Sequence, residues 1–301
     1  MKDNLKILIF SDLHFTEHLF DTFDFEKSSK LLQYALPLLD KLTKKINYEI
    51  KPDVVICLGD LIQDNNNHDI DINRIKLVWR FFQEIKRPFY SLPGNHDLKT
   101  MNSREEVEKI MGYSHSTFSV DIKGYHLIFL GTEVDKNIKP EGGGISRTRK
   151  ISESDLIWLD NDLEETKLPS LVFCHYGIAE DTMKGNRQFE NCPEDALIEN
   201  RVELKRILGK SNKVIGVFSG HQHWNKCIEE NGINYYLVGS LIENLNKNGI
   251  PDGAYMTVSI NEKGIEALEN HLSIDKKINR EEFENYINKR MYQLKNIENE
   301  R

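Results

Sequence analysis

The chain contains a series of short apolar runs, each followed within three residues by a side chain that can bind a cation. Runs rich in branched apolar residues recur at 5–10, 54–58, 89–92, 171–174 and 214–219. Runs of this length, bounded by polar residues or glycine, are typical of strands that are buried on both faces. Helical patterns separate several of these runs, so the sequence predicts an α/β fold.

The apolar spacing between the runs predicts three helices. Residues 31–46 and 75–85 repeat apolar side chains at helical intervals, and we expect Pro37 to kink or break the first helix. Ser152 precedes acidic residues and an apolar pattern, which is typical of a helix N-terminus. The polar segment 63–69 has no such pattern, and we expect it to be mobile surface.

The second half of the chain carries antiparallel signals. The dipeptides Lys123-Gly124 and Asn231-Gly232 each separate two strand-like runs, and dipeptides of this kind favour short hairpin turns. From Arg280 onward, the apolar spacing predicts an amphipathic closing helix.

Length and charge restrict the class of protein. A chain of 301 residues can bury a large core without disulfides. We expect one domain over 1–275, with a helical extension over 276–301 that packs on it. Lys and Arg number 40 against 48 Asp and Glu, and the net charge of −8 gives no broad cationic surface for nucleic acid.

Targeting signals are absent from the sequence pattern. No run approaches the roughly 18 apolar residues that a membrane helix requires. The first residues lack the arrangement of a secretory signal, and the 4 cysteines show no paired C-x-x-C spacing. These features predict a reduced, cytoplasmic protein that does not enter a membrane.

The residues that follow the buried runs carry the chemical signal. Because the carboxyl ends of strands in an open α/β sheet share one crevice, we expect these residues to lie close together. Carboxylate, amide and imidazole ligands without thiolate suit Mn, Fe, Co, Ni or Zn. One motif alone is often only a turn or a cap, but five in this context predict a metal site. The motifs are Asp12-Leu13-His14, Gly59-Asp60, Gly94-Asn95-His96-Asp97, His175 and Gly220-His221-Gln222-His223.

This ordered set resembles the motifs of the calcineurin-like metallophosphoesterases, over about residues 5–260. Between the motifs, Gly144-Ile145-Ser146 and Trp158-Leu159 resemble the branch related to cyclic-nucleotide phosphodiesterases. The resemblance implies a four-layer α/β/β/α sandwich, in which two mixed β-sheets are flanked by helices. It also implies two divalent metal ions at the strand ends, and a catalytic role for the predicted main domain.

The resemblance implies how the ligands are divided between the two ions. Three side chains would hold each ion, and one carboxylate would bridge them: Asp12, His14 and His223 for the first; Asn95, His175 and His221 for the second; and Asp60 between them. The third motif departs from the family's His-x-Pro pattern, because this chain reads His175-Tyr176-Gly177. That departure predicts a different loop shape beside a retained ligand.

Two divalent ions roughly 3.5–4 Å apart can clamp the attacking and leaving oxygens of a displacement at phosphorus. A water shared by both ions would ionise near neutral pH, and the bridging hydroxide would attack. By the resemblance, His96 is not a ligand but faces the substrate, where it would protonate the leaving alkoxide or stabilise charge. Asp97 would orient the His96 ring, with a solvated or capping Asp97 as the alternative.

We therefore predict hydrolysis of a small-molecule phosphodiester, such as a cyclic nucleotide, a glycerophosphodiester or a nucleotide diphosphate derivative. A phosphomonoesterase, a protein phosphatase and a nuclease are alternatives on the same fold, as is a non-catalytic scaffold. Gln63, Asp64 and Asp97 depart from the protein-phosphatase motifs, and the acidic balance disfavours a nuclease. We expect the loops at 64–73, 133–145 and 180–193 to determine specificity.

Overall fold

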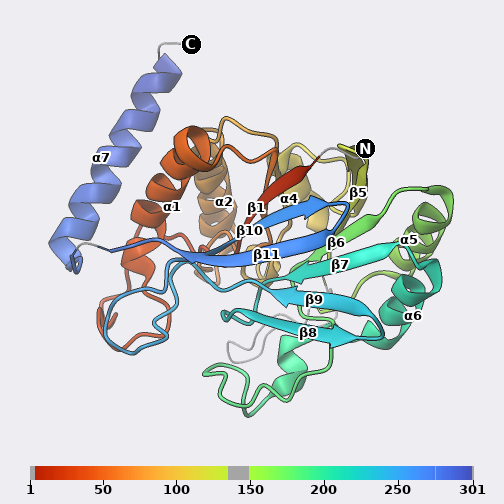
Figure 1. Cartoon of the computed structure of the whole chain (residues 1–301). Helices are drawn as coiled ribbons and strands as arrows, with labels where there is room; N and C mark the ends of the chain where they lie inside the picture. The colour runs from red at the N-terminus through yellow and green to blue at the C-terminus, as the bar shows by residue number, and fades with distance from the viewer. Residues whose placement is uncertain (1–3, 135–148, 275, 300–301) are drawn as a thin grey trace.

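The structure is a computed structural model that describes residues 4–134, 149–274 and 276–299. Two mixed β-sheets face one another (Figure 1). The first contains, in spatial order, β11 (Gly264–His271), β10 (Ala254–Asn261), β1 (Leu5–Phe10), β2 (Val54–Cys57) and β3 (Phe89–Ser91). The second contains β4 (Phe118–Ile122), β5 (Tyr125–Leu130), β6 (Ser170–Cys174), β7 (Val214–Ser219), β9 (Ile233–Leu237) and β8 (Lys226–Glu230).

The strands that precede the sequence motifs run parallel at the centre of each sheet. β1 pairs in parallel with β2, and β2 with β3, while β10 and β11 complete that sheet in antiparallel register. In the second sheet β5, β6, β7 and β9 are parallel, and antiparallel β4 and β8 form the edges. Parallel pairing brings the carboxyl ends of neighbouring strands to the same side of each sheet.

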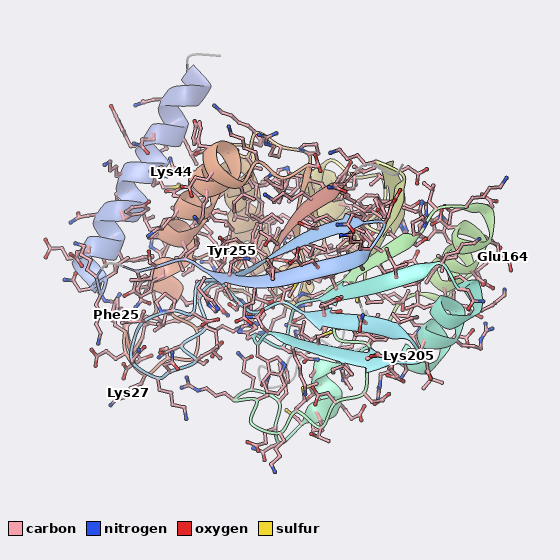
Figure 2. All side chains as sticks on the ribbon, viewed as in Figure 1. Phe25, Lys27, Lys44, Glu164, Lys205 and Tyr255 are labelled. Carbon is pink, nitrogen blue, oxygen red and sulfur yellow. The ribbon has the colours of Figure 1, made fainter. Side chains whose placement is uncertain are left out.

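Helices cover the outer face of each sheet. α1 (Ala35–Lys44), α2 (His68–Phe82) and α4 (Arg104–Met111) belong with the first sheet. α5 (Glu153–Glu165) and α6 (Arg201–Ser211) belong with the second. The predicted four-layer sandwich of two mixed sheets is therefore confirmed, and side chains fill the space between its layers (Figure 2).

Alternation along the strands builds this layering. Ile7 and Ile9 of β1 join the core between the sheets, whereas Leu8 and Phe10 pack toward the helices of the first sheet. Successive side chains of a strand point to opposite faces, so a strand between two apolar layers must be apolar at every position. This requirement explains why the runs read as continuous apolar segments.

The predicted strands and hairpins agree closely with the structure. The five runs become β1, β2, β3, β6 and β7, with bounds that shift by one residue at most. Lys123 and Gly124 adopt φ values of 50° and 79°, and Asn231 and Gly232 adopt 53° and 77°. Positive φ at both central residues is what a tight hairpin turn of matching twist requires.

The helix predicted over 31–46 is divided into three pieces. A 3-10 turn, η1 (Leu32–Tyr34), precedes α1, and a π-helical segment, η2 (Lys45–Ile50), follows it. Pro37 lies in the first turn of α1 and does not break it. Proline is tolerated there because the first backbone N–H groups of a helix have no partner within the helix.

The segment 63–69 was expected to be mobile surface, and that prediction is wrong in part. α2 begins at His68, and the Asn67 side chain accepts a hydrogen bond of 3.1 Å from the Ile70 backbone N–H. Polar residues therefore cap a helix here, and acidic Asp69 and Asp71 favour its N-terminus. Asp64 is 4 % exposed and belongs to the site described below.

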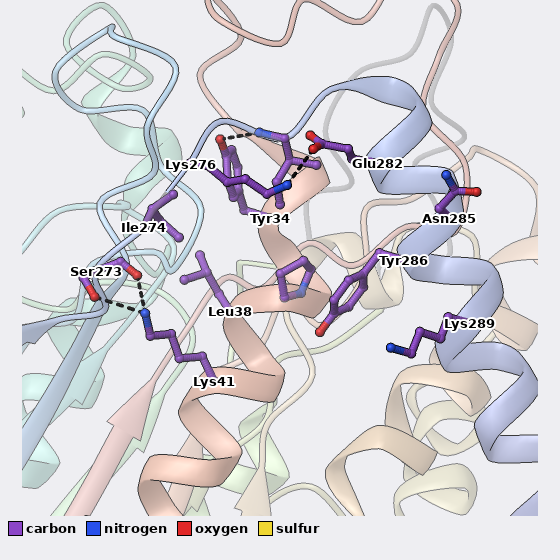
Figure 3. A pocket seen from close by; sticks show the side chains of 12 residues that line it. Tyr34, Leu38, Lys41, Ser273, Ile274, Lys276, Glu282, Asn285, Tyr286 and Lys289 are labelled. Carbon is purple, nitrogen blue, oxygen red and sulfur yellow. Dashed lines mark hydrogen bonds and ion pairs between the residues drawn. The ribbon is translucent and has the colours of Figure 1, made fainter.

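The closing helix α7 (Arg280–Asn299) packs beside α1 (Figure 1). Phe283 and Ile287 are buried in the same cluster as the α1 side chains, and Arg290 contacts Asp40 and Glu84. A cavity of about 580 Å³ lies between α1, α7 and the connecting residues Ser273, Ile274, Lys276 and Ile278 (Figure 3). The predicted boundary between a main domain that ends at residue 275 and an extension that begins at residue 276 stays a prediction.

Among the described helices, none has both the length and the apolar character needed to cross a bilayer.

His126 of β5 is a buried titratable group held between two carboxylates. It is 5 % exposed and lies 2.6 Å from Asp121 and 2.8 Å from Asp162. Burial lowers the pKa of His126, but its hydrogen bonds to these carboxylates raise the pKa by more. A raised pKa in the folded state means that the ion pairs stabilise the fold at low pH, and that this stability is lost as pH rises through the folded pKa.

We expect His126→Gln to reduce the free energy of unfolding most below about pH 6.5, the ordinary histidine pKa. Urea unfolding of both proteins across a pH series measures this, and the gap between them should narrow as pH rises above that value. The exposed His115 offers a matched control, because His115→Gln removes an imidazole from the surface. A gap for His126→Gln that is constant with pH would contradict the expectation.

Candidate metal centre

The loops that follow β1, β2, β3, β6 and β7 bring the motif side chains together. Asp12, His14, Asp60 and His223 form one group, in which one ligand atom from each lies within 4.8 Å of the others. Asp60, His175 and His221 form a second group by the same measure. Asp60 belongs to both groups, so the two adjoin at a single carboxylate.

In the first group, the Nε2 nitrogens of His14 and His223 lie next to each other and next to the carboxylates of Asp12 and Asp60. His14 Nε2 lies 3.1 Å from His223 Nε2, 3.9 Å from Asp12 Oδ1 and 3.7 Å from Asp60 Oδ2. His223 Nε2 lies 3.2 Å from Asp12 Oδ1. All four side chains are buried, so four potential ligand atoms converge in a space that excludes bulk water.

The second group faces the other oxygen of Asp60. His175 Nε2 lies 3.5 Å from Asp60 Oδ1 and 3.1 Å from Asn95 Oδ1. The His221 ring lies beside the His175 ring, with 5.0 Å between their centroids. The structure thus brings all seven predicted ligands together, with one Asp60 oxygen toward each group.

The loops reverse sharply in order to aim these side chains. Asp12, His14, Asp60, His221 and His223 all have positive φ, between 46° and 64°. This left-handed conformation is uncommon for residues other than glycine, although Asp and His adopt it more readily than most. Gly94 permits a close approach as well, because a Cβ there would collide with the Asp60 carboxylate.

Three of the histidines are oriented by an acceptor behind the ring. His175 Nδ1 lies 2.8 Å from the Leu58 carbonyl, and His221 Nε2 lies 3.1 Å from the Asp195 carbonyl. His223 Nδ1 lies 2.7 Å from Glu243 Oε2. Acceptors of this kind fix which nitrogen holds the proton, and they leave the other nitrogen free for a cation.

Glu243 and Gln188 are functional candidates that the sequence analysis missed. Gln188 Nε2 donates to Glu243 Oε2 at 3.1 Å, so the carboxylate behind His223 is itself held in place. Neither residue lies in a recognisable motif. The bridge between 29–31 and 241–244 places Glu243, and no periodicity in the sequence indicates that pairing.

The chemistry of the donors fits two divalent ions. Asp12 Oδ1 is buried and accepts no hydrogen bond from the described residues. Burial lowers the pKa of both His14 and His221 far below its usual range, so both rings are neutral and offer lone pairs. Burial opposes ionisation of Asp12, but the neighbouring His223 outweighs it and lowers the Asp12 pKa.

His223 differs from His14 and His221 in having a raised pKa. Burial lowers its pKa, but the charges of Asp12 and Glu243 raise it to about 9. A divalent cation beside Asp12 would replace a proton on this ring, because metal binding and protonation compete for the same nitrogen. The site offers the carboxylate oxygen of Asp12, neutral imidazole rings and the amide oxygen of Asn95. These donors together match the ligands of first-row divalent metals.

His96 lies at the open side of the two groups. Its side chain is 18 % exposed, whereas the seven predicted ligands are exposed by 5 % or less. His96 Nε2 lies 3.9 Å from Asp60 Oδ2, and Nδ1 contacts Asp64. Lys99 donates to the other Asp64 oxygen at 2.8 Å. Asp64 and Lys99 therefore fix the ring with Nε2 toward the crevice.

The position predicted for Asp97 beside the His96 ring is occupied by Asp64. The Asp97 carboxylate accepts hydrogen bonds from the backbone N–H groups of Leu61, Ile62 and Gly94, at 2.8 to 3.1 Å. Asp97 thus caps the short helix α3 (Asn95–Leu98) and holds the Asp60 loop, which is the alternative considered for it. Burial and the nearby Asp60 raise the Asp97 pKa.

Lys30 is a further residue that no sequence motif indicated. Its Nζ lies 3.0 Å from His96 Nε2 and 3.4 Å from His14 Nδ1. Burial lowers the pKa of Lys30, while the charges of Asp60, Asp12, Glu243 and Asp64 raise it in part. A cation therefore stands beside the open edge of the acidic cluster.

Parts of the predicted site lie outside the described residues. These are the Gly144-Ile145-Ser146 motif and most of the loop at 133–145. The third predicted loop, 180–193, leads into the short helix η3 (Pro193–Ala196) and includes buried Met183 and Phe189. The Phe189 ring lies 4.9 Å from the His221 ring, so this loop covers the second group.

Two mixed sheets with a paired Asp/His cluster at their strand ends are the framework of a metal-dependent phosphoester hydrolase. The chain belongs to the calcineurin-like phosphoesterase family, whose family model matches residues 5–225. The resemblance inferred from the motifs is thereby confirmed, and so is the expectation of an enzyme of this family.

Three known proteins show how this chain compares. A probable glycerophosphodiester phosphodiesterase, GpdQ, from Arcobacter nitrofigilis is 28 % identical over 191 residues, and the match spans 60 % of this chain and 63 % of that protein. A dimetal phosphatase from Danio rerio has a TM-score of 0.65 at 16 % identity, covering 89 % of this chain and 99 % of that one. A putative 5'-nucleotidase from Staphylococcus aureus has a TM-score of 0.53 at 13 % identity, covering 98 % and 58 %. Both structures are similar in fold.

Proposed function

We propose that this chain hydrolyses a phosphodiester of a small organic molecule, using two divalent metal ions. The first ion would be held by Asp12, His14 and His223, and the second by Asn95, His175 and His221. Asp60 would be a ligand shared by both ions. When bound, the ions would supply Lewis acidity and a nucleophile derived from water at neutral pH. The observation that carries the proposal is the sharing of Asp60 by two ligand groups beside His96.

The protein's own residues account for the remaining chemistry. His96 is fixed by Asp64, and its Nε2 faces the crevice at the exposed side of the cluster. An imidazole there can transfer a proton to the departing oxygen or stabilise charge as it develops. The buried ligands leave this side as the approach for substrate.

The proposed substrate class rests on a relative as well as on the site. The curated relative from Arcobacter nitrofigilis is described as a probable glycerophosphodiester phosphodiesterase. Because the match spans less than two thirds of its length, its activity supports the proposal but does not establish it for this chain. We therefore propose a small diester as the substrate, with the glycerophosphodiester first among the candidates to test.

The test combines metal analysis with a substrate panel. The purified protein is stripped with a chelator, reloaded with Mn, Fe, Co, Ni or Zn in turn, and assayed on several phosphoesters. These are bis-p-nitrophenyl phosphate, a glycerophosphodiester, a cyclic nucleotide and p-nitrophenyl phosphate. We expect about two ions per chain, turnover that depends on the metal, and higher kcat/KM on diesters than on the monoester.

Two results would contradict the proposal. Full turnover after chelation would rule out the metal-dependent chemistry. Preference for the monoester or for DNA over every small diester would instead favour the phosphomonoesterase or the nuclease alternative. Binding of two ions without turnover of any ester would favour a non-catalytic role.

A further inference from the structure

Lys30 lies at the open edge of the site and forms no direct ion pair with the described residues. Among the described residues, no carboxylate oxygen lies within 4.0 Å of its ammonium group, although exposed lysines elsewhere pair at 2.7 to 2.9 Å. Its two neighbours are the His96 ring and the far nitrogen of His14. No direct ion pair therefore neutralises its charge, although Asp60 and the neighbouring carboxylates lie near enough to raise its pKa in part.

The fold holds Lys30 in this place. The flanking backbone is tied to the segment that contains Glu243, through Leu31 N to Ile242 O at 2.9 Å and Asn244 N to Ser29 O at 2.7 Å. Asn244 Nδ2 also donates to the carbonyl oxygens of Glu26 and Ser28. The Lys30 side chain thus extends from a backbone segment that hydrogen bonds hold in place. Little backbone freedom is therefore lost when the side chain contacts a ligand.

The hydrogen bonding around His14 and Lys30 leaves the Lys30 ammonium group able to donate to a bound ligand. His14 directs Nε2 toward Asp12 and Asp60. If Nε2 binds a metal ion, the ring proton is on Nδ1, because a ligating nitrogen carries no proton. Lys30 has only N–H donors, and it lies 3.4 Å from that Nδ1. The other three histidines each direct the corresponding nitrogen at an oxygen. At His14 this nitrogen faces the Lys30 ammonium group instead, beside the crevice.

We propose that Lys30 is a substrate-binding residue, whose ammonium group donates hydrogen bonds to a non-bridging oxygen of the phosphoryl group beside His96. This inference rests on the proposed function and deepens it, because it assigns a charge preference to the same site. Coulombic attraction grows with ligand charge. Whichever ester the whole site prefers, Lys30 therefore contributes more to binding a doubly charged phosphate, of a monoester or of the inorganic phosphate product, than to binding a singly charged diester.

The experiment compares Lys30→Met and Lys30→Arg with the unmodified protein, all loaded with metal. Lys27→Met is the matched control, because Lys27 is exposed on the outside of the same segment (Figure 2). Three quantities are measured: bound metal per chain, the dissociation constant of inorganic phosphate by calorimetry, and kcat and KM on p-nitrophenyl phosphate and bis-p-nitrophenyl phosphate.

We expect Lys30→Met to keep its metal and to weaken phosphate binding by about tenfold to a hundredfold, as for a lost hydrogen bond between charged groups. KM for the monoester should rise by more than KM for the diester, while Lys30→Arg keeps part of the affinity. Phosphate affinity within twofold of the unmodified protein would overturn the inference, and so would loss of metal from Lys30→Met. If no ester is hydrolysed by any of the proteins, the proposed function fails, while the phosphate titration still decides the role of Lys30.

Discussion

Replacement of Asp60 by asparagine is expected to reduce turnover of bis-p-nitrophenyl phosphate by about a thousandfold or more. Asp60 is the one side chain common to both ligand groups, with Oδ1 toward His175 and Oδ2 toward His14. An amide of the same shape removes the negative charge between two cations, and metal-ion effects amount to several kcal/mol, each 1.36 kcal/mol being tenfold in rate. The measurements are kcat on the diester and metal per chain by elemental analysis.

The exposed Asp21 provides the control for the Asp60 experiment. Asp21→Asn makes the same chemical change at the surface of the segment that leads to Lys30, and we expect it to leave both turnover and metal content unchanged. Robust turnover by Asp60→Asn with two ions still bound would be incompatible with a site that spans this carboxylate.

Replacement of His96 by alanine is expected to lower kcat by about 10²–10⁴, the range for loss of a general acid. Metal content should stay the same, because the ring lies outside both ligand groups. The loss should be larger for a glycerophosphodiester than for bis-p-nitrophenyl phosphate, since an alkoxide needs a proton as it departs and p-nitrophenolate does not. Steady-state kinetics on the two substrates measure the difference.

Two further variants separate proton transfer from ring placement at His96. Asp64→Asn weakens the contact that fixes the ring, so it should act in the same direction with a smaller loss. The exposed His271 contacts Asp252 and Glu269 but none of the proposed ligands, and His271→Ala should change neither rate. Equal losses on both substrates in His96→Ala would assign His96 to charge stabilisation and would contradict proton transfer to the leaving oxygen.

The sheets and their motifs could be predicted because both signals are local in sequence. A strand between two apolar layers must be apolar throughout, so β1 and β6 are visible as runs. The dipeptides at Lys123 and Asn231 fix hairpins for steric reasons. The ligands follow strand ends directly, so strand order alone brings His175 and His221 to the same crevice.

Residues that reach the site through tertiary pairing could not be predicted in this way. Lys30 and Glu243 are brought together by a bridge between segments more than two hundred residues apart. Asp64 lies in a stretch that resembles an exposed loop. Asp97 is adjacent to His96, but neighbouring residues in a helical turn point in different directions, so its carboxylate faces the backbone behind the ring.

The left-handed backbone at five of the seven proposed ligands also bears on how this protein could be engineered. Each such residue costs roughly 1–2 kcal/mol relative to an ordinary backbone conformation, and the surrounding strands offset that cost. Glycine at Asp12, His14 or His223 would relieve the strain while removing a ligand. Directed evolution for heat resistance alone would thus enrich variants that are robust but inactive, unless each round also selects for turnover.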